Sequence, residues 1–286
     1  MGAKSSLEQS GLRPRKKWGQ NFLTDRRILT SIADAADVNA RDTVLEIGPG
    51  LGHLTRVLAT RAAHVVAVEV DADLADRLQN QFLGELNIII YHGDILQREP
   101  AEWIWAGNIP APRFKVVANL PYYITSAILR HLLEADRKPS VVVVMVQRQV
   151  AQRMMAKPPD MNLLAVSVQF YARVRLVRTI APGAFYPKPK VESAVVRLDV
   201  YDTPPLHVAD PSDFFELVRA GFGERRKQLR NALARGLDLE PQQAANLLAR
   251  AQIDATRRAE TLSLDEWGVL YRAWVGNPIA ARREQV

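Results

Sequence analysis

Short apolar runs recur along the first two thirds of the chain, and each is followed by glycine or by polar residues. Such bounded runs are typical of buried strands, and the stretches between several of them have helical spacing. Five strands are expected in this region, at residues 43–47, 64–69, 87–91, 116–118 and 141–146. The pattern therefore predicts an α/β fold built on a parallel sheet.

Polar residues at the strand ends form a second regularity. The first four runs lead into Gly48, Glu69, Asp94 and Asn119. Parallel strands bring their carboxyl ends to one edge of the sheet, where open α/β sheets bind ligands. A purely structural origin would require four independent accidents, so the pattern favours a ligand site at this edge.

The pattern changes further along the chain. Residues 174–180 and 193–200 alternate and predict an antiparallel pair, and residues 202–205 indicate a linker. Further helices are expected after a Thr24 or Asp25 cap and at 53–60, 147–155, 161–171, 214–222, 227–235, 242–251 and 264–275, the last with a Ser263/Glu266 capping box. We therefore expect a flexible arm at 1–12, an α/β domain at 13–203 and a smaller all-α domain at 204–286.

Composition excludes several classes of site. The chain has no cysteine, which rules out disulfides and thiolate metal sites, and its five histidines lack ligand spacing, so no metal is expected. The longest apolar stretch, 141–146, is far shorter than the ~20 residues that span a bilayer. The polar start carries no apolar signal core, so we expect a cytoplasmic protein without membrane contact.

The net charge of +7 is unevenly distributed. Residues 201–286 hold 12 basic and 12 acidic residues, so the whole excess lies before them. A basic surface attracts phosphate and nucleic acid, although proteins that never bind RNA also carry such charge. Two clusters, Arg13–Lys17 beside Trp18 and Arg225–Arg230, either contact RNA or form a solvated tail and helix face.

The segment Gly48-Pro49-Gly50-Leu51-Gly52 joins a strand to a helix. Its glycines permit a tight turn and close approach of a ligand, and the helix start offers N–H groups. It is not the dinucleotide-binding fingerprint, because the third glycine of that motif would fall at His53. With Glu69 placed for ribose hydroxyls and Asp94 for an adenine amino group, the loop indicates a nucleotide-like cofactor.

Asn119 opens the segment Asn-Leu-Pro-Tyr. Its amide oxygen, the carbonyl of Leu120 or Pro121 and the ring of Tyr122 together suit a planar ligand with an exocyclic amino group, such as adenine. The alternative is a strand-to-helix turn in which the amide bonds the backbone. Phe185, in a segment rich in proline and lysine, is a second candidate for stacking on a base.

Five segments in this order and spacing resemble the KsgA-type, or RsmA, ribosomal RNA adenine N6-dimethyltransferases over residues 12 to 275. They are Gln20–Leu23, Glu46–Gly52, Asn119–Tyr122, Phe185–Val191 and Arg258–Leu262. The resemblance implies a Rossmann-like S-adenosylmethionine-dependent methyltransferase sheet with a helical domain that contacts RNA. It also implies S-adenosyl-L-methionine as cofactor and two adjacent adenines near the 3′ end of 16S ribosomal RNA, within the small ribosomal subunit, as substrate.

The resemblance also implies a set of site residues. The cofactor would be bound by Asn21, Leu23, Gly48, Gly50, Gly52, Glu69, Asp94, Ile95 and Asn119. The catalytic residues would be Asn119, Leu120, Pro121, Tyr122 and Phe185. Acceptance of both amino hydrogens of adenine would localise charge on its nitrogen, and no covalent nucleophile is expected. We expect the protein to act as a monomer.

Two other functions fit parts of the sequence. The related large-subunit adenine methyltransferases that confer macrolide resistance share the chemistry, but they more often carry isoleucine at the position of Leu120, and the segment 182–191 favours the small-subunit enzymes. A binding protein without turnover, such as an assembly checkpoint or a transcription factor, is disfavoured by the intact motifs. The tryptophan-rich segment 99–113 is longer than the family needs and is expected to be a surface excursion without a catalytic role.

Overall fold

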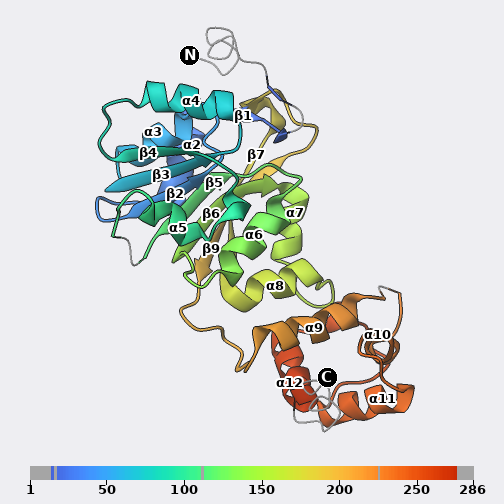
Figure 1. The fold of residues 1–286 in the computed structure, drawn as a ribbon. Helices are drawn as coiled ribbons and strands as arrows, with labels where there is room; N and C mark the ends of the chain where they lie inside the picture. The colour runs from blue at the N-terminus through green and yellow to red at the C-terminus, as the bar shows by residue number, and fades with distance from the viewer. Residues whose placement is uncertain (1–13, 16–17, 111–112, 225, 276–286) are drawn as a thin grey trace. The chain divides into compact units, whose positions relative to one another are not determined.

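The computed structural model describes residues 14–15, 18–110, 113–224 and 226–275 (Figure 1). It divides into two compact units. Unit 1 comprises the described residues up to Ala151 together with Arg173–Asp202, and unit 2 comprises Gln152–Ala172 and the described residues from Thr203 onward. The flexible arm expected at 1–12 lies outside the described residues.

Unit 1 is built on a seven-stranded sheet of order β4-β3-β2-β5-β6-β9-β7. The strands are β2 (Thr43–Ile47), β3 (His64–Glu69), β4 (Ile88–His92), β5 (Lys115–Asn119), β6 (Val141–Gln147), β7 (Ala172–Ile180) and β9 (Ser193–Val200). The strands from β4 to β6 are parallel, and β9 runs antiparallel to β6. The parallel sheet predicted from the apolar runs is confirmed.

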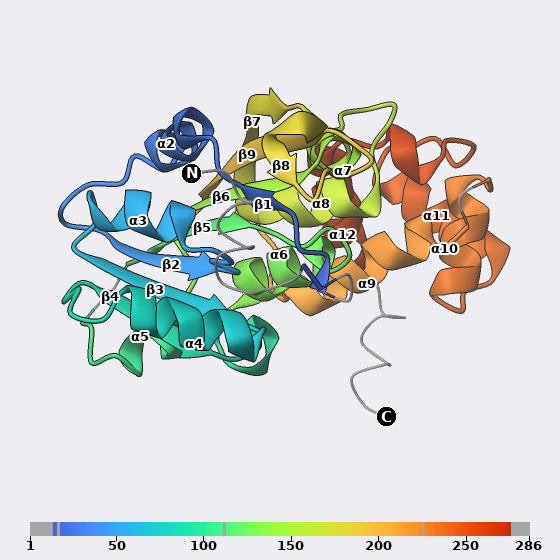
Figure 2. The same cartoon turned by 90° about the horizontal axis from the view of Figure 1, so that it is seen from above.

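Helices lie on both faces of this sheet (Figures 1 and 2). They are α2 (Arg26–Ala35), α3 (His53–Ala59), α4 (Ala72–Gln81), α5 (Pro100–Trp105) and α6 (Thr125–Glu134), and α7 (Arg148–Met154) follows β6. The predicted Asp25 cap is confirmed, because its carboxylate accepts the N–H groups of Arg27 and Ile28. Ile32 of α2 and Leu58 of α3 pack with strand residues in one apolar cluster.

The segment 99–113 differs from the expected surface excursion. Its first half is helix α5, whose Trp103 is buried at 4% exposure, whereas Trp105 is 43% exposed. A Cβ atom added to Gly93 would lie 2.4 Å from the Trp103 ring, so the glycine makes room for the indole. Because Gly93 precedes Asp94, the helix supports the strand end that lines the predicted site.

Unit 2 is helical. Its elements are α8 (Leu163–Tyr171), α9 (Pro211–Phe222), α10 (Leu229–Gly236), α11 (Pro241–Arg250) and α12 (Leu264–Val275). The predicted capping box is confirmed, since Ser263 N–H donates to Glu266 at 2.7 Å and Glu266 N–H donates to Ser263 Oγ at 3.2 Å. None of the described helices is long and apolar enough to cross a membrane.

Two sequence expectations about this unit need correction. The sequence placed residues 152–172 with the α/β domain, but Phe170 of α8 stacks on Phe214 of α9 with ring centroids 4.9 Å apart, which ties this segment to unit 2. The cations of 225–230 do not form one helix face, because α10 begins only at Leu229. Arg226 and Lys227 precede the helix and are exposed, and Arg225 lies outside the described residues.

Candidate active site

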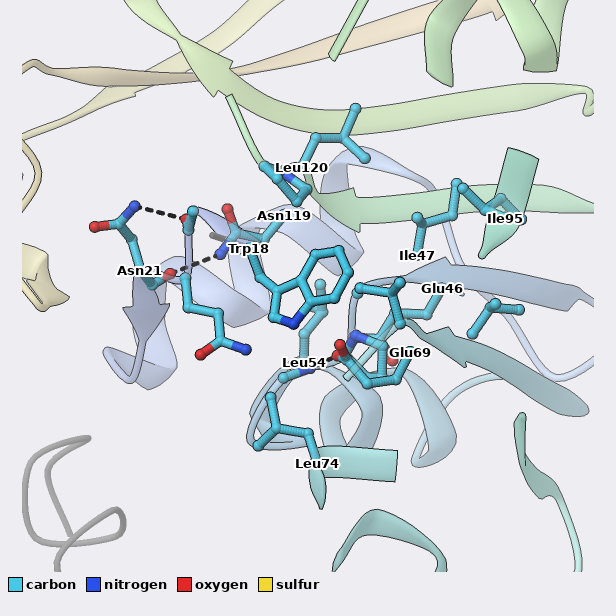
Figure 3. Close-up of a pocket in the computed structure, with 18 of the residues that line it drawn as sticks. Trp18, Asn21, Glu46, Ile47, Leu54, Glu69, Leu74, Ile95, Asn119 and Leu120 are labelled. Carbon is cyan, nitrogen blue, oxygen red and sulfur yellow. Dashed lines mark hydrogen bonds between the residues drawn. The ribbon is translucent and has the colours of Figure 1, made fainter. Parts of the chain in front are cut away.

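A cavity of about 430 Å³ opens at the carboxyl ends of β2, β3 and β5 in unit 1 (Figure 3). It brings together most of the residues that the sequence singled out: Asn21, Leu23, Gly48, Gly50, Glu69, Asp94, Ile95, Asn119, Leu120, Pro121 and Tyr122. Gly52 and Phe185 do not line it. Among the described residues, no group of histidine and acidic side chains could hold a metal ion.

The glycine loop shapes one wall of the cavity. Gly48, Gly50 and Gly52 all have positive φ, between 59° and 76°, a conformation that favours glycine. Their N–H groups are used within the protein, by Val68 O, the Glu69 carboxylate and Pro49 O. The loop therefore allows close approach of a ligand, while the N–H groups of these three glycines are already used within the protein.

Glu69 ends β3 as a buried carboxylate held by the backbone. One of its oxygens accepts the N–H of Gly50 and the other that of Asp71, each at 3.0 Å. Burial raises the pKa of Glu69, and these two hydrogen bonds oppose the rise. Each carboxylate oxygen can accept a second hydrogen bond, so the group suits two neighbouring hydroxyls such as those of a ribose.

The segment before β1 (Phe22–Leu23) contributes lining residues to the cavity and is held by polar contacts. Arg15 forms ion pairs with Asp71 and Asp73, and Gln20 Nε2 donates to Asp71 at 3.0 Å. Trp18 lines the cavity, a place that the sequence did not predict for it. Its position beside the Gln20–Leu23 motif was the only available signal, because the contacts that hold the segment come from more than fifty residues away.

Asn119 is held with one side of its amide already bonded. Its Nδ2 donates to Asn21 O at 3.1 Å, and Asn21 Nδ2 donates in turn to Gly19 O at 2.9 Å (Figure 3). No hydrogen bond from a described residue reaches Asn119 Oδ1. The amide is therefore oriented by the chain, and its oxygen remains available to accept a hydrogen bond in the cavity.

The structure also separates the two carbonyls that the sequence left as alternatives. Pro121 O accepts the N–H of Ile124 at 3.3 Å and the hydroxyl of Thr125 at 3.2 Å. No described residue donates to Leu120 O, while Leu120 N–H is fixed on Met145 O. Asn119 Oδ1 and Leu120 O, at the end of β5, thus both lack a partner within the described chain.

Phe185 lies elsewhere than its predicted role requires. It belongs to the short strand β8 (Phe185–Tyr186), which pairs with β1 so that Phe185 faces Leu23. The side chain is 5% exposed and packs in the core with Leu23 and Ile28. The ring therefore supports the segment that carries Asn21 and has no open face for a base. Tyr123, which the sequence left without a role, lines the cavity and is 62% exposed.

Glu46 is a cavity residue that the sequence missed. It sits on β2, is 1% exposed, and its Oε2 has no hydrogen-bond partner. Burial is the main cause that raises the pKa of Glu46 to about 8. The negative charge of the neighbouring Glu69 adds to the rise, and hydrogen bonding by Thr55 opposes it with a smaller effect. The side chain is therefore a neutral acid near pH 7. A single polar residue within an apolar run does not change the prediction of a buried strand. The only signal for Glu46 was therefore its place in the Glu46–Gly52 segment.

Replacement of Glu46 by glutamine is expected to make stability less dependent on pH. An unfolded glutamate releases its proton near pH ~4.3, whereas folded Glu46 keeps it up to about pH 8, so wild-type stability falls as pH rises between these values, by at most ~1.4 kcal/mol per pH unit. Glu46→Gln lacks this contribution. Urea unfolding at pH 5, 6, 7 and 8 should show that the free energy of unfolding of the variant rises relative to that of the wild type as pH increases. The exposed Glu85→Gln is the control, and a constant difference for Glu46→Gln would contradict the assignment.

The fold and this cavity define the class of the protein. A parallel sheet whose first strand leads into a glycine loop, with an acid after the next strand and an Asn-Leu-Pro-Tyr segment after β5, is the framework of a Rossmann-like methyltransferase. The cavity fits S-adenosylmethionine: Glu69 presents two oxygens for a diol, Asp94 a carboxylate, and Ile47 and Ile95 apolar walls.

Comparison with known proteins gives the family. The family described as Ribosomal RNA adenine dimethylase matches residues 11–271, so the chain belongs to this family. Its members transfer methyl groups from S-adenosylmethionine to the N6 atom of ribosomal RNA adenine, and this chain is such an enzyme. The resemblance inferred from the sequence motifs is confirmed.

Individual relatives agree with this assignment. The chain is 49% identical to a Ribosomal RNA small subunit methyltransferase A of Dehalococcoides mccartyi, over 96% of this chain and 94% of the relative. It is 43% identical to the protein of that name from Moorella thermoacetica, over 93% and 94%. Among solved structures, the 23S rRNA methyltransferase ErmE is 28% identical, with a TM-score of 0.70 over 88% of this chain and 99% of that one. A dimethyladenosine transferase from Plasmodium falciparum, 24% identical over 87% and 95% with a TM-score of 0.73, shares the fold.

Proposed function

We propose that the chain dimethylates two adjacent adenines near the 3′ end of 16S ribosomal RNA, within the small ribosomal subunit. The observation that carries the proposal is the pair of acceptors, Asn119 Oδ1 and Leu120 O, at the edge of the cavity. The names of the small-subunit relatives at 43–49% identity support the choice of subunit.

The pair of acceptors matches the two N–H bonds of an adenine amino group. The lone pair of that nitrogen is delocalised into the ring, so acceptance of both hydrogens favours localisation of charge on the nitrogen. When bound, S-adenosylmethionine supplies an activated methyl group. Asn119 and Leu120 then hold the nitrogen in line, and positioning of this kind contributes up to ~7–11 kcal/mol. Asn21 O keeps the Asn119 amide from turning.

Other residues are assigned supporting roles. We assign Asn21, Leu23, Gly48, Gly50, Glu69, Asp94 and Ile95 to the cofactor, as lining residues of the cavity. The target adenine must leave its stack to reach the site, and Tyr122 is assigned to hold its face. Pro121 fixes the turn after β5, and its carbonyl accepts the hydroxyl of Thr125 at the start of α6.

The proposal is tested by labelling. The protein would be incubated with tritiated S-adenosylmethionine and small subunits from cells that lack the modification, and the labelled nucleoside identified after digestion. Labelled dimethyladenosine near the 3′ end of 16S ribosomal RNA is the expected result. Tight subunit binding without label would instead favour an assembly factor without turnover.

The likeness to ErmE makes the large subunit the second candidate substrate. The same incubation with large subunits separates the two, since label in 23S ribosomal RNA alone would overturn the small-subunit proposal. Action as a monomer, a cytoplasmic location and RNA contact by the 204–286 region remain predictions, which sedimentation, fractionation and crosslinking would test.

Ser193 is expected to act on methyl transfer through Tyr122. The Tyr122 hydroxyl and Ser193 Oγ lie 2.6 Å apart, and Ser193 is fully buried at the start of β9. Loss of this bond frees the ring, so Ser193→Ala and Tyr122→Phe should each lower kcat about 10-fold, the value of one hydrogen bond. Cofactor affinity should not change.

A double-mutant cycle distinguishes positioning from general damage. The double variant should be no slower than either single variant, because both remove the same hydrogen bond. Ser140→Ala, which removes a hydroxyl bonded to Phe114 O, is the matched control and should leave kcat unchanged. Losses that multiply in the double variant would show that Ser193 does not act through Tyr122.

A further inference from the structure

Strand β7 carries three arginines at the edge of the unit 1 sheet. It lies at the end of the strand order, with β9 as its neighbour. Arg173, Arg175 and Arg178, here called the arginine row, are all exposed, and no acidic residue occurs between residues 172 and 180. The cavity, the cofactor residues and the Asn119 turn use none of them.

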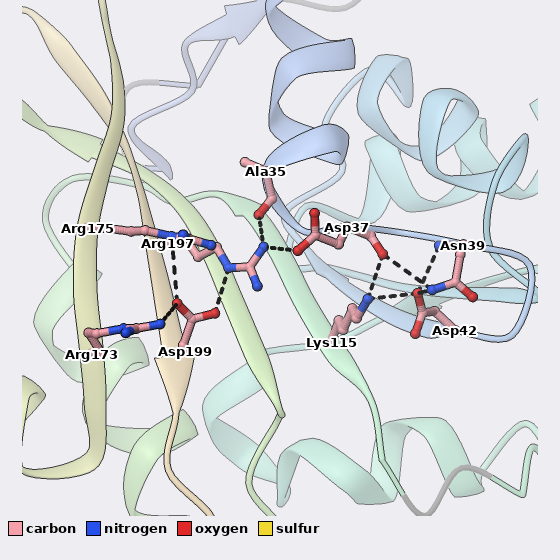
Figure 4. Close-up of polar contacts among 9 residues, drawn as sticks. All are labelled: Ala35, Asp37, Asn39, Asp42, Lys115, Arg173, Arg175, Arg197 and Asp199. Carbon is pink, nitrogen blue, oxygen red and sulfur yellow. Dashed lines mark hydrogen bonds and ion pairs between the residues drawn. The ribbon is translucent and has the colours of Figure 1, made fainter.

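Two members of the arginine row share a single carboxylate with Arg197. Arg173 and Arg175 approach Asp199 Oδ2 at 3.8 and 3.6 Å, and Arg197 Nε donates to Asp199 Oδ1 at 2.7 Å (Figure 4). Three guanidinium groups thus face one acid. Arg197 is nearly buried and also bonds Ala35 O and Asp37, whereas the Arg173 and Arg175 side chains remain 71% and 52% exposed.

Neighbouring acids do not cancel this surplus. Asp37 is paired with Arg197, whose hydrogen bond lowers the pKa of that carboxyl, and Asp42 is paired with Lys115 at 2.8 Å. The acids shown in Figure 4 are therefore already engaged by buried or half-buried cations. The exposed guanidinium groups of the arginine row keep most of their five N–H donors for an outside partner.

The arginine row runs beside the helix that walls the cavity. Arg178 Nη1 donates to Ser31 Oγ of α2 at 3.0 Å, and Arg197 reaches the end of the same helix at Ala35 O. Leu29 and Ile32, on the same helix, line the cavity. A helix is about 10 Å across, so an RNA whose adenine enters the cavity can extend to the arginine row.

Edge strands often carry cations simply to prevent pairing with another strand. That role alone does not account for the residue type or for the exposed apolar pair Leu176 and Val177 left within the strand. Guanidinium groups bind phosphate in a bidentate way that a solvated lysine does not match. Charge complementarity therefore favours a phosphate-bearing partner over a second strand.

We propose that the arginine row binds backbone phosphates of the substrate ribosomal RNA outside the cavity, as a contact that adds affinity without reading sequence. The proposal rests on the proposed ribosomal RNA substrate. It assigns to β7 a role in holding the RNA while the target adenine occupies the site beyond α2.

The test compares full-length variants for binding to unmethylated small subunits without cofactor, across a range of salt concentrations. Replacing Arg173, Arg175 and Arg178 together by glutamine should weaken binding at least ~10-fold at 0.1 M salt and reduce the salt slope by ~2 to 3, since each of the three lost phosphate contacts removes ~0.7–0.9. The triple lysine variant should keep much of the slope.

The matched control removes three arginines that each pair with a carboxylate of their own: Arg61→Gln, Arg113→Gln and Arg130→Gln. It has the same net charge and should bind nearly as the wild type does. Thermal unfolding confirms that both triple variants are folded. Equal weakening of both triple variants, an unchanged slope, or altered self-association of the row variant in sedimentation would overturn the proposal. If the wild type itself does not bind small subunits, the proposed substrate fails instead.

Discussion

Replacement of Asn119 by alanine is expected to lower kcat by at least ~100- to 1,000-fold, the range seen when one group that stabilises a transition state is removed. The variant loses Oδ1, the side-chain acceptor at the end of β5, and leaves Asn21 O without its donor. Leu120 O then remains to accept one of the two amino hydrogens. Charge is no longer localised on the target nitrogen, and the nitrogen is not held in line with the methyl group. Single-turnover methyl transfer to small subunits measures the effect.

Binding separates this role from a structural one. Small-subunit affinity should stay within a few-fold of wild type, because Asn119 is assigned a single contact with the target adenine and the proposed phosphate contacts of the arginine row are left intact. Asn80→Ala is the matched control, since it also removes an amide bonded to a backbone carbonyl, on the exposed face of α4. Asn119→Ala that lost RNA binding and methyl transfer equally would exclude the chemical role.

The edge of the sheet could be predicted because it follows from local pattern. Apolar runs fixed the strands, and parallel strands must bring Glu69, Asp94 and Asn119 to one edge, which the cavity confirms. The arrangement within the edge could not be predicted. Whether Leu120 O or Pro121 O is available depends on the hydrogen bonds of Ile124 and Thr125, and backbone bonding at a turn leaves no trace in composition.

The sequence predictions were wrong where a side chain packs against a segment other than its own. The surrounding prolines and lysines predicted an exposed Phe185. In the structure it pairs with Leu23 of β1, 162 residues earlier in the chain, and is buried. The tryptophan-rich excursion reads as surface, yet the absence of a Cβ at Gly93 admits Trp103. In both cases the side chain's environment is set by a partner that the local sequence does not identify.

Gly52 shows how a motif residue can act without touching the ligand. Its φ is +76°, and a Cβ there would lie 2.7 Å from Leu78 Cδ2 and 2.9 Å from Phe82 Cε2, both buried on α4 or at its end. Gly52→Ala should therefore lower the free energy of unfolding by roughly 2–5 kcal/mol, combining ~1–2 for the left-handed backbone with ~1–3 for overpacking. Urea unfolding measures the loss.

Two other glycines divide that loss into its causes. Gly84 has a φ of +91° with nothing within 4 Å of an added Cβ, so Gly84→Ala should cost only the backbone term of ~1–2 kcal/mol. Gly183 has neither a positive φ nor a neighbour, so Gly183→Ala should stay within ~0.5 kcal/mol of wild type. If Gly52→Ala cost no more than Gly84→Ala, the packing of the glycine loop on α4 would not be what requires glycine there. The third glycine of the motif would then have to be explained by the cofactor, as the sequence alone suggested.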